Sequence, residues 1–303
     1  MPLEQVLVLG ANGYLGSHVA RRLDEQGYSC VRAGTRERSE HGAGDYVRLD
    51  VREPASLEAA VAAARYVFAF AGLTGTRRSF SEAGRFVETN ETGLLNVLDA
   101  VRRSRGPAKV IFPSTRLVYR GVLGSSLKED DEKEFKTVYA LSKYACERYL
   151  SMYQHAFGID YTVFRICVPY GTRFGRHESF GTVSAMIARA ARGEDLEIFG
   201  DGHQRRTLTH VEDLAEIIVT AGLSDITDND VFNVGGPDAL NVREIAGQIA
   251  AVHGVRVRSV PWPDEDRVIE SGDTVFDDSK LQGCVPHRFR HDFGSWLKTL
   301  RAP

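Results

Sequence analysis

The sequence predicts an α/β fold in which helices cover both faces of a parallel sheet, with a smaller lobe near the C-terminus. Short apolar runs alternate with helical stretches along the first part of the chain, which is typical of a doubly wound sheet. Prolines break this regularity in the last third. The strand-like runs are Val6 to Leu9, Ser29 to Ala33, Tyr46 to Leu49, Tyr66 to Phe70, Val110 to Phe112, Tyr161 to Ile166 and Val231 to Val234.

The first strand-like run leads through a glycine-rich turn, residues 10–16, into a helical stretch from Ser17 to Gln26. Glycines let the backbone turn tightly, and the N-terminus of the following helix offers free N–H groups to a phosphate. The turn has the spacing G-x-x-G-x-x-G, and its position after the first strand indicates a dinucleotide site. The candidate contacts are Gly10, Asn12, Gly13, Tyr14, Leu15 and Gly16.

The end of the second strand bears on cofactor choice. An NAD site usually has an acidic residue there, about 20 residues past the glycine turn, to bind the adenosine ribose. Here that place holds Gly34, Thr35 and Arg36, with Arg32 and Arg38 close by. A glycine followed by arginine leaves room for a 2′-phosphate and attracts it, which favours NADP(H). NAD(H) stays open, with the arginines then facing only solvent.

A tyrosine and a lysine one helical turn apart suggest proton transfer. Tyr139 and Lys143 have the i, i+4 spacing that places side chains next to each other on a helix. A nearby cation favours the phenolate form of tyrosine, so we expect Lys143 to lower the pKa of Tyr139. Ser114 and Thr115 directly follow the run Val110 to Phe112, at the carboxyl end of a predicted strand, where ligands bind in such sheets.

Taken together, these motifs resemble an extended short-chain dehydrogenase/reductase, the NAD(P)-dependent sugar-nucleotide epimerase/dehydratase family. The resemblance runs nearly end to end and implies a Rossmann-like sheet with a substrate-binding lobe. Further matching segments are Asn90 in Thr89–Gly93, Arg165–Gly171, Gly200–Arg206, His210–Asp213 and Phe232–Gly235.

The resemblance also implies roles for single residues. Thr115, Tyr139 and Lys143 match the catalytic triad, and Tyr139 and Lys143 would also contact the cofactor. Further cofactor contacts by resemblance are Asp50, Val51, Ala71, Gly72 and Asn90, and the candidate substrate contacts are Thr74, Ser114, Thr115, Arg173 and Arg206.

The resemblance divides the chain into two domains. We expect residues 1–167 and 206–235 to form the NAD(P)-binding Rossmann domain, and residues 168–205 and 236–303 to form the lobe over the substrate. Family members dimerise through two helices, which correspond here to Phe86–Arg102 and Val138–Gln154, so a homodimer is expected.

Departures from the family pattern narrow the reaction. Dehydratases carry an Asp-Glu pair after the threonine, where this chain has Arg116-Leu117, which disfavours dehydration. We expect a 4-ketoreductase or 4-epimerase acting on a nucleotide-diphosphate sugar. Val168, in place of an asparagine that contacts the diphosphate, leaves open an NADPH-dependent reductase of a small aldehyde or ketone. A non-enzymatic dinucleotide-sensing protein is the third alternative.

Composition excludes several other classes. A net charge of −3 without a long basic block argues against a nucleic-acid surface. The apolar run from Ala59 to Leu73 contains Arg65 and is too short for a membrane span. The N-terminus passes directly into the first strand, and the cysteines lack metal or disulfide spacing, so we expect a cytoplasmic protein.

No metal site is expected. His177, His203 and His210 share no spacing typical of metal ligands. Thr209 and Glu212 fit a capping box at a helix start.

Overall fold

The computed structural model describes residues 5–40, 44–104, 106, 108–172 and 181–300. The chain forms two compact units, which we describe separately. The first unit comprises Met1–Val118, Thr137–Arg165 and Ala215–Phe232, and the second comprises Tyr119–Lys136, Ile166–Leu214 and Asn233–Pro303.

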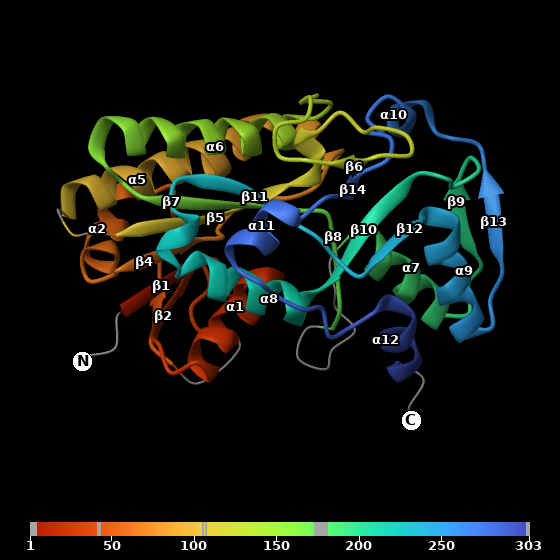
Figure 1. Cartoon of the computed structure of the whole chain (residues 1–303), viewed down its shortest axis with the longest axis horizontal. Helices are drawn as coiled ribbons and strands as arrows, with labels where there is room; N and C mark the ends of the chain where they lie inside the picture. Colours follow the sequence, from red (N-terminus) through yellow and green to blue (C-terminus); the bar gives the residue numbers. More distant parts are fainter. Residues whose placement is uncertain (1–4, 41–43, 105, 107, 173–180, 301–303) are drawn as a thin grey trace. The chain divides into compact units, whose positions relative to one another are not determined.

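A seven-stranded sheet with the order β11-β7-β5-β4-β1-β2-β3 forms the centre of the first unit (Figure 1). Strand β1 pairs in parallel with both β2 and β4. Strand β3 pairs in parallel with β2, and β5 pairs in parallel with β4. These pairings confirm the predicted parallel sheet. The strands are β1 (Gln5–Leu9), β2 (Ser29–Gly34), β3 (Tyr46–Arg48), β4 (Tyr66–Ala69), β5 (Lys109–Thr115), β7 (Tyr161–Ile166) and β11 (Asp230–Val234).

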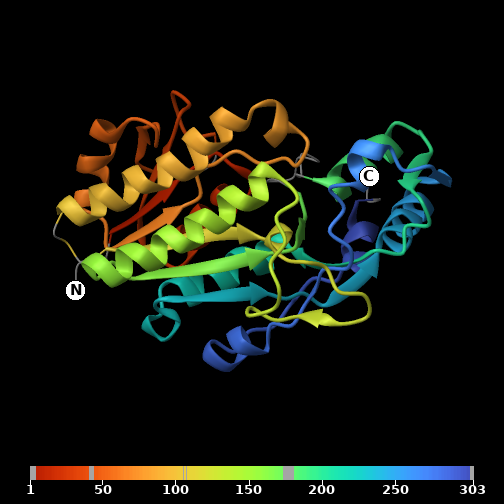
Figure 2. The same cartoon turned by 90° about the horizontal axis from the view of Figure 1, so that it is seen from above.

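Helices cover both faces of this sheet (Figures 1 and 2). One face packs against α2, α5 and α6 through a buried cluster that includes Leu57, Leu98 and Leu150. On the other face lie α1 and α8, which an ion pair joins between Arg22 and Glu216 at 3.2 Å. The helices are α1 (Tyr14–Glu25), α2 (Pro54–Ala62), α3 (Arg78–Ser81), α4 (Ala83–Phe86), η1 (Val87–Thr92), α5 (Gly93–Ser104), η2 (Arg116–Val118), α6 (Val138–Phe157), α8 (Val211–Gly222) and η3 (Asp225–Thr227).

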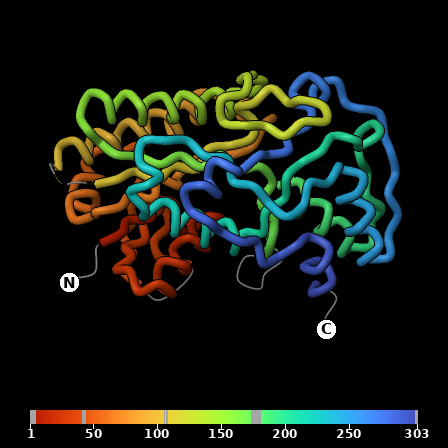
Figure 3. The backbone as a smooth tube through the Cα atoms, viewed as in Figure 1, coloured from red at the N-terminus to blue at the C-terminus, as the bar shows by residue number. Residues whose placement is uncertain are grey.

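Local sequence signals set the ends of α6, the longest of these helices. The Thr137 hydroxyl accepts the Ala140 N–H at 3.1 Å, and Gly158 ends the helix in the left-handed conformation. The predicted helix Phe86–Arg102 is present but contains a π-helical turn, because α4 continues through η1 into α5. Figure 3 draws the backbone of this segment as part of the orange tube. Such turns often occur at functional sites.

The second unit contains three small sheets, β12-β10-β8, β13-β9 and β14-β6. Its core joins α7, α9 and α12 through side chains such as Ile187, Ile249 and Trp296. The elements are β6 (Ser126–Leu127), β8 (Val168–Tyr170), α7 (Thr182–Ala191), β9 (Leu196–Phe199), β10 (Arg205–His210), β12 (Asp238–Asn241), α9 (Val242–His253), β13 (Val257–Val260), α10 (Asp264–Arg267), β14 (Val275–Phe276), α11 (Ser279–Cys284) and α12 (Phe293–Thr299).

The predicted capping box at residues 209–212 is wrong. The Thr209 hydroxyl donates to the Gly235 carbonyl at 2.6 Å, and β10 continues through His210. A capping box occurs instead at α9, between Asn241 and Glu244.

The two compact units follow chain boundaries different from those of the expected domains. Residues 119–136, which we expected in the nucleotide-binding domain, belong to the second unit. Among the described residues, no helix combines the length and apolar character needed to cross a membrane. All four cysteines carry free thiols.

Candidate active site

The glycine turn after β1 holds the backbone too close to its neighbours for any side chain. Gly10 has a φ of 79°, and a Cβ on it would lie 2.7 Å from the Ala71 nitrogen. A Cβ on Gly16 would lie 2.4 Å from the Gly10 carbonyl oxygen. Helix α1 begins at Tyr14, earlier than the predicted Ser17, so its N-terminus directly follows the turn. The start of α1, where a helix presents N–H groups to a phosphate, thus lies directly at this tight turn.

A cavity of about 380 Å³ lies in the first unit, at the turn and at the ends of β1 to β4. Predicted cofactor contacts line much of it, namely Gly10, Asn12, Gly13, Gly34, Thr35, Arg36, Asp50, Val51, Ala71 and Gly72. Other predicted cofactor contacts are not among the residues that line this cavity, namely Tyr14, Leu15, Gly16, Asn90, Tyr139 and Lys143.

The sequence analysis missed several residues that line the cavity. Arg52 follows the candidate pair at residues 50 and 51, and Arg85 and Thr89 come from α4 and η1. Arg52 could have been found, because it extends the loop after β3, and its guanidinium bonds to Asp50 at 2.6 Å. Thr89 could also have been found, because it lies in the family-like segment Thr89–Gly93, whereas Arg85 on α4 lies outside the matching segments. The other missed residues are Leu9, Ala33, Leu49, Phe70 and Leu73.

The arginines after β2 differ in their availability. Arg36 is largely exposed and forms an ion pair with Glu40. Arg32 is buried and pairs with Asp24 of α1, so it does not contribute to the loop as expected. Asn12 holds this loop in place, since its amide donates to the Arg38 carbonyl at 3.1 Å and accepts the Glu40 N–H at 2.9 Å.

Asn90 fixes the loop after β4. Its side chain, buried in η1, accepts the Leu73 N–H at 2.7 Å and donates to the Leu73 carbonyl at 3.0 Å. A Cβ on Gly72 would lie 3.0 Å from the Asn90 oxygen. The Asn90 amide therefore holds the loop at Gly72 and Leu73, which line the cavity.

The three candidate catalytic side chains lie in the first unit, where β5 ends and α6 begins. Thr115 is the last residue of β5, and a hydrogen bond links its side chain to Tyr139 in the first turn of α6. The Lys143 ammonium donates to the Pro113 carbonyl at 2.8 Å and lies 4.3 Å from the centre of the Phe112 ring.

Burial controls the protonation of these groups. It raises the pKa of Tyr139 to about 12, and the Thr115 hydrogen bond and the charge of Arg116 lower this pKa only in part. Burial also lowers the pKa of Lys143 to about 8, against the attraction of Cys146 and Glu147. Lys143 is not among the groups that lower the pKa of Tyr139 here, and its effect together with a bound nicotinamide stays a prediction. Tyr139 is a protonated phenol at neutral pH, and its charged neighbour is Arg116.

Ser114 points away from this group into a buried network. Its hydroxyl donates to Glu147 at 2.5 Å, and the same carboxylate accepts two bonds from Arg165 at 3.0 and 2.6 Å. All three side chains are buried. Because Ser114 is held by Glu147, Thr115 is the hydroxyl beside Tyr139.

The remaining candidate substrate contacts are dispersed. Thr74 lies half-buried in the loop after β4. In the second unit, Arg206 is buried and bonds to Glu270 at 2.5 Å and to the Gly272 carbonyl at 2.5 Å, while Val168 packs against the core. Arg173 lies outside the described residues.

The sequence profile of the NAD dependent epimerase/dehydratase family matches residues 6–235. This chain belongs to that family. The epimerase/dehydratase family member is similar to UDP-N-acetyl-alpha-D-glucosaminuronate decarboxylase of Bacillus cytotoxicus, with 27% identity covering 81% of this chain and 79% of the relative. It is also similar to a Streptomyces dTDP-4-dehydro-6-deoxy-D-allose reductase, with 28% identity covering 82% and 81%.

Among solved structures, this family member is similar to the UDP-glucose 4-epimerase of Thermus thermophilus in complex with NAD. The TM-score is 0.86 at 25% identity, covering 97% of this chain and 96% of the other. The family name implies a nicotinamide dinucleotide, and the residues here fit one. Side-chain-free backbone at Gly10 and Gly16, a helix N-terminus and a cavity of suitable lining are what a pyrophosphate and its ribose require.

Proposed function

We propose that this protein is an NAD(P)-dependent oxidoreductase or epimerase that acts at C4 of a nucleotide-diphosphate sugar. The observation that carries the proposal is the grouping of Thr115, Tyr139 and Lys143 in the same unit as the glycine-lined cavity. The relatives support the substrate class, since they include a reductase of a dTDP-4-dehydro sugar and a UDP-glucose 4-epimerase.

The chain's own groups suit proton transfer in the direction of reduction. Tyr139, held protonated by burial, donates its proton to the oxygen of a C4 ketone as negative charge develops there. Thr115 orients the same oxygen through its hydroxyl. Arg116, whose charge lowers the pKa of Tyr139, stabilises the phenolate that remains after the proton has left. A bound nicotinamide supplies the hydride acceptor or donor, and the reverse steps describe oxidation.

Activity of a Tyr139→Phe variant tests this assignment. Loss of the phenol is expected to lower kcat/KM for reduction of a 4-keto nucleotide sugar by about 10²- to 10⁴-fold, the usual size of general acid catalysis. The affinity of Tyr139→Phe for the nucleotide should stay unchanged. As a control, Tyr144→Phe, five residues further along α6, should keep full activity. If both variants keep wild-type activity, Tyr139 is not the proton donor.

We further propose a preference for NADP(H). Arg36 lines the cavity beside Gly34, and Glu40 is its present partner. Arg36→Leu is expected to weaken NADPH binding by about 10-fold or more, the size of one charged hydrogen bond, and to leave NADH binding nearly unchanged. Glu40→Gln should tighten NADPH binding, because it frees the guanidinium. Binding titrations of each variant with NADPH and with NADH test this preference. If Arg36→Leu loses the same affinity for NADPH as for NADH, the preference is contradicted.

The nucleotide that leaves the purified protein on denaturation separates the two C4 reactions. Retained NAD(H) would favour an epimerase, which returns the hydride to the same carbon and has no need to exchange its cofactor. A protein that releases none and prefers NADPH would favour a ketoreductase.

A reductase of small aldehydes or ketones is the second candidate. It is favoured by the second unit, where Glu270 already binds Arg206 and the apolar Val168 packs into the core. Turnover of simple ketones, with none of any 4-keto nucleotide sugar, would replace the first proposal by this one.

We also propose a homodimer formed through α5 and α6, which lie side by side in the first unit (Figure 2). Leu141 and Met152 on α6 are 51% and 61% exposed. They are three helical turns apart and therefore on one face of the helix. A second copy of the chain would cover this face.

A further inference from the structure

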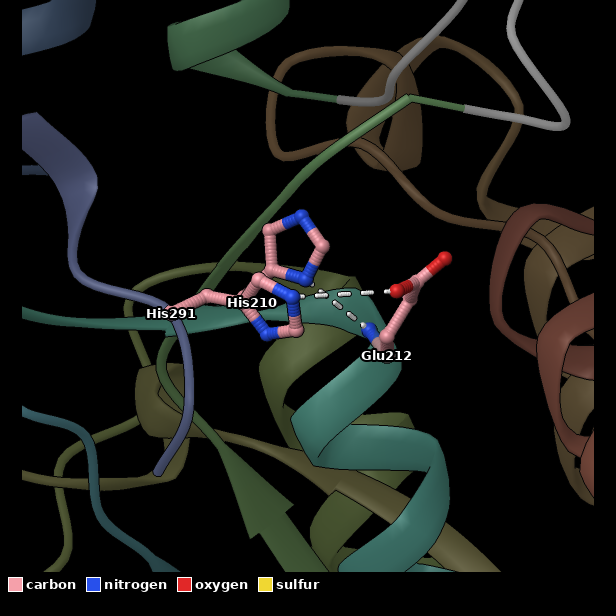
Figure 4. Close-up of side chains that lie close together, drawn as sticks. All are labelled: His210, Glu212 and His291. Atoms are coloured by element: carbon pink, nitrogen blue, oxygen red, sulfur yellow. Dashed lines mark hydrogen bonds and ion pairs between the residues drawn. The ribbon is translucent and has the colours of Figure 1, made fainter. Parts of the chain in front are cut away.

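His291 meets His210 and Glu212, which are distant from it in sequence, in the second unit (Figure 4). His210 ends β10, Glu212 lies in the first turn of α8, and His291 precedes α12. One nitrogen or oxygen of each side chain lies within 4.8 Å of the other two. The two imidazole rings stack with their centres 4.1 Å apart, and the His291 Nε2 atom is 3.8 Å from the Glu212 carboxylate.

A hydrogen bond to Asp213 sets the tautomer of the His291 ring. The buried Asp213 carboxylate accepts the backbone N–H groups of Arg290 and His291 at 2.9 and 3.0 Å. Its other oxygen lies 2.9 Å from His291 Nδ1. A carboxylate accepts hydrogen bonds, so the ring proton is on Nδ1 and the lone pair of the neutral ring is on Nε2. This carboxylate–histidine arrangement orients histidines that bind metals.

Gly171 lies against the His210 ring. A Cβ on this residue would lie 3.0 Å from His210 Nε2, and Gly171 has a φ of 131°, which other residues rarely adopt. His210 itself is only 5% exposed and is held between the Tyr170 ring and the His291 ring. The Glu212 N–H also donates to His210 Nδ1 at 3.4 Å, so the ring is enclosed and fixed in position.

We propose that His210, Glu212 and His291 form a binding site for a divalent transition-metal ion of the Zn²⁺ type. Imidazole nitrogens with one carboxylate oxygen are ligands that suit zinc, and three protein ligands leave a fourth position open. The Asp213 carboxylate lies next to this site on His291, and its charge adds to that of the ligand Glu212 in favouring a cation.

The geometry needs a modest adjustment. Metal–ligand bonds of about 2.0–2.2 Å place the donor atoms of a tetrahedral site about 3.4 Å from one another. The three donor atoms here lie within 4.8 Å of one another, so they must move closer together. Glu212 and His291 can supply this movement, because their side chains are 42% and 34% exposed. The enclosed His210 ring would stay in place as the fixed ligand.

The sequence contains little sign of this site. His210 and Glu212 are two residues apart, but His291 lies in another part of the chain, and only the fold brings it to the start of α8.

Zinc binding by the tag-free, EDTA-treated full-length protein tests the proposal. Equilibrium dialysis against Zn²⁺ should show one ion per chain, saturating at a free concentration on the order of 10 µM or below. His291→Gln and Glu212→Gln should each weaken binding by more than about 100-fold, and Asp213→Asn by about 10- to 100-fold, because it only orients a ligand. Co²⁺ in the same site should give the visible absorption of tetrahedral coordination.

A matched control is His203→Ala, which removes an exposed histidine beside Asp201 in the same unit. It should leave Zn²⁺ affinity unchanged. No saturable binding, or equal binding by wild type, His291→Gln and Glu212→Gln, would show that the stacked rings serve packing alone and would overturn the proposal. These two variants alter partly exposed side chains, so the test does not depend on replacing the enclosed His210.

Discussion

Tyr139 and Lys143 lie one helical turn apart, and burial moves their pKa values in opposite directions. The pKa of Tyr139 rises to about 12 and that of Lys143 falls to about 8, because each environment disfavours the charged form. Lys143 bonds to the Pro113 carbonyl, whereas Arg116 is the charge that acts on Tyr139. Arg116, which directly follows Thr115, thus opposes part of the pKa rise that burial causes at Tyr139.

Replacing Arg116 by leucine is expected to raise the pKa of Tyr139, since the charge of Arg116 lowers it. Oxidation of the sugar needs the phenolate, so its rate should rise with pH, and the midpoint should move to higher pH in the variant. Below the midpoint the rate should fall about two- to tenfold, as a pKa change of up to about one unit gives. The pH profile of kcat/KM measures this. Arg103→Leu, on the exposed end of α5, should leave the profile in place, and an unmoved profile in both variants would refute the role of Arg116.

Lys143→Met separates stability from activity. The lysine is 6% exposed, and its pKa falls from 10.5 in the unfolded chain to about 8 in the folded one. Below about pH 8 both states are protonated, and the cost of the buried charge is fully present. Between about pH 8 and 10.5 the unfolded chain binds more protons, so the wild type gains stability as pH rises, by about 3 kcal/mol in all.

The methionine variant lacks this titration. Urea unfolding of both proteins at several pH values should therefore show a difference in unfolding free energy that grows in favour of the wild type above pH 8. At neutral pH the variant should fold as well as the wild type, yet have lost most activity. A difference that stays constant with pH would show that Lys143 does not titrate as a buried amine.

At the scale of elements, one buried ion pair connects β5, α6 and β7. Glu147 on α6 binds Ser114 at the end of β5 and Arg165 at the end of β7. The network lies one turn beyond Lys143 and fixes which hydroxyl of β5 faces Tyr139. The helix that carries the phenol is thus attached to the strand that carries Thr115.

Glu147→Gln should destabilise the protein by about 3–5 kcal/mol, because it leaves the buried Arg165 without its counter-charge. Replacing both partners, as in Glu147→Leu with Arg165→Met, should cost less than the single change. Urea unfolding measures both variants, with Glu194→Gln in the exposed Arg192 pair as a control that leaves Tm unchanged. If the double variant is the less stable one, the unpaired arginine is not the source of the cost.

At the scale of the whole molecule, the proposed dimer depends on an apolar face of α6. Met152→Glu is expected to give a monomer, because it would place a charge at a buried interface. Light scattering after gel filtration measures the mass of the variant. Its thermal unfolding should still be cooperative, which would show that the charge separates the subunits and does not unfold the chain. Ile226→Glu, at an apolar residue of η3 that is 62% exposed, should keep the wild-type mass. Wild-type protein that is already monomeric at micromolar concentration would remove the proposal.

Much of the fold was predictable because it depends on local patterns. Apolar strand runs alternating with helical stretches predicted the parallel sheet, and its pairings confirm it. The glycine turn was also predictable, since Gly10 and Gly16 occupy places where the backbone itself excludes a side chain. The family followed from the same motifs, and the profile match over residues 6–235 confirms it.

The sequence alone thus determined the sheet, the dinucleotide turn and the family, because each is encoded in neighbouring residues. The tertiary structure decided what depends on burial and on contacts between distant segments. Burial raised the pKa of Tyr139 to about 12. Arg32 pairs with Asp24 instead of facing the loop after β2, and Ser114 bonds to the buried Glu147. The fold also places His291 next to His210 and Glu212, and no spacing in the sequence predicts this contact.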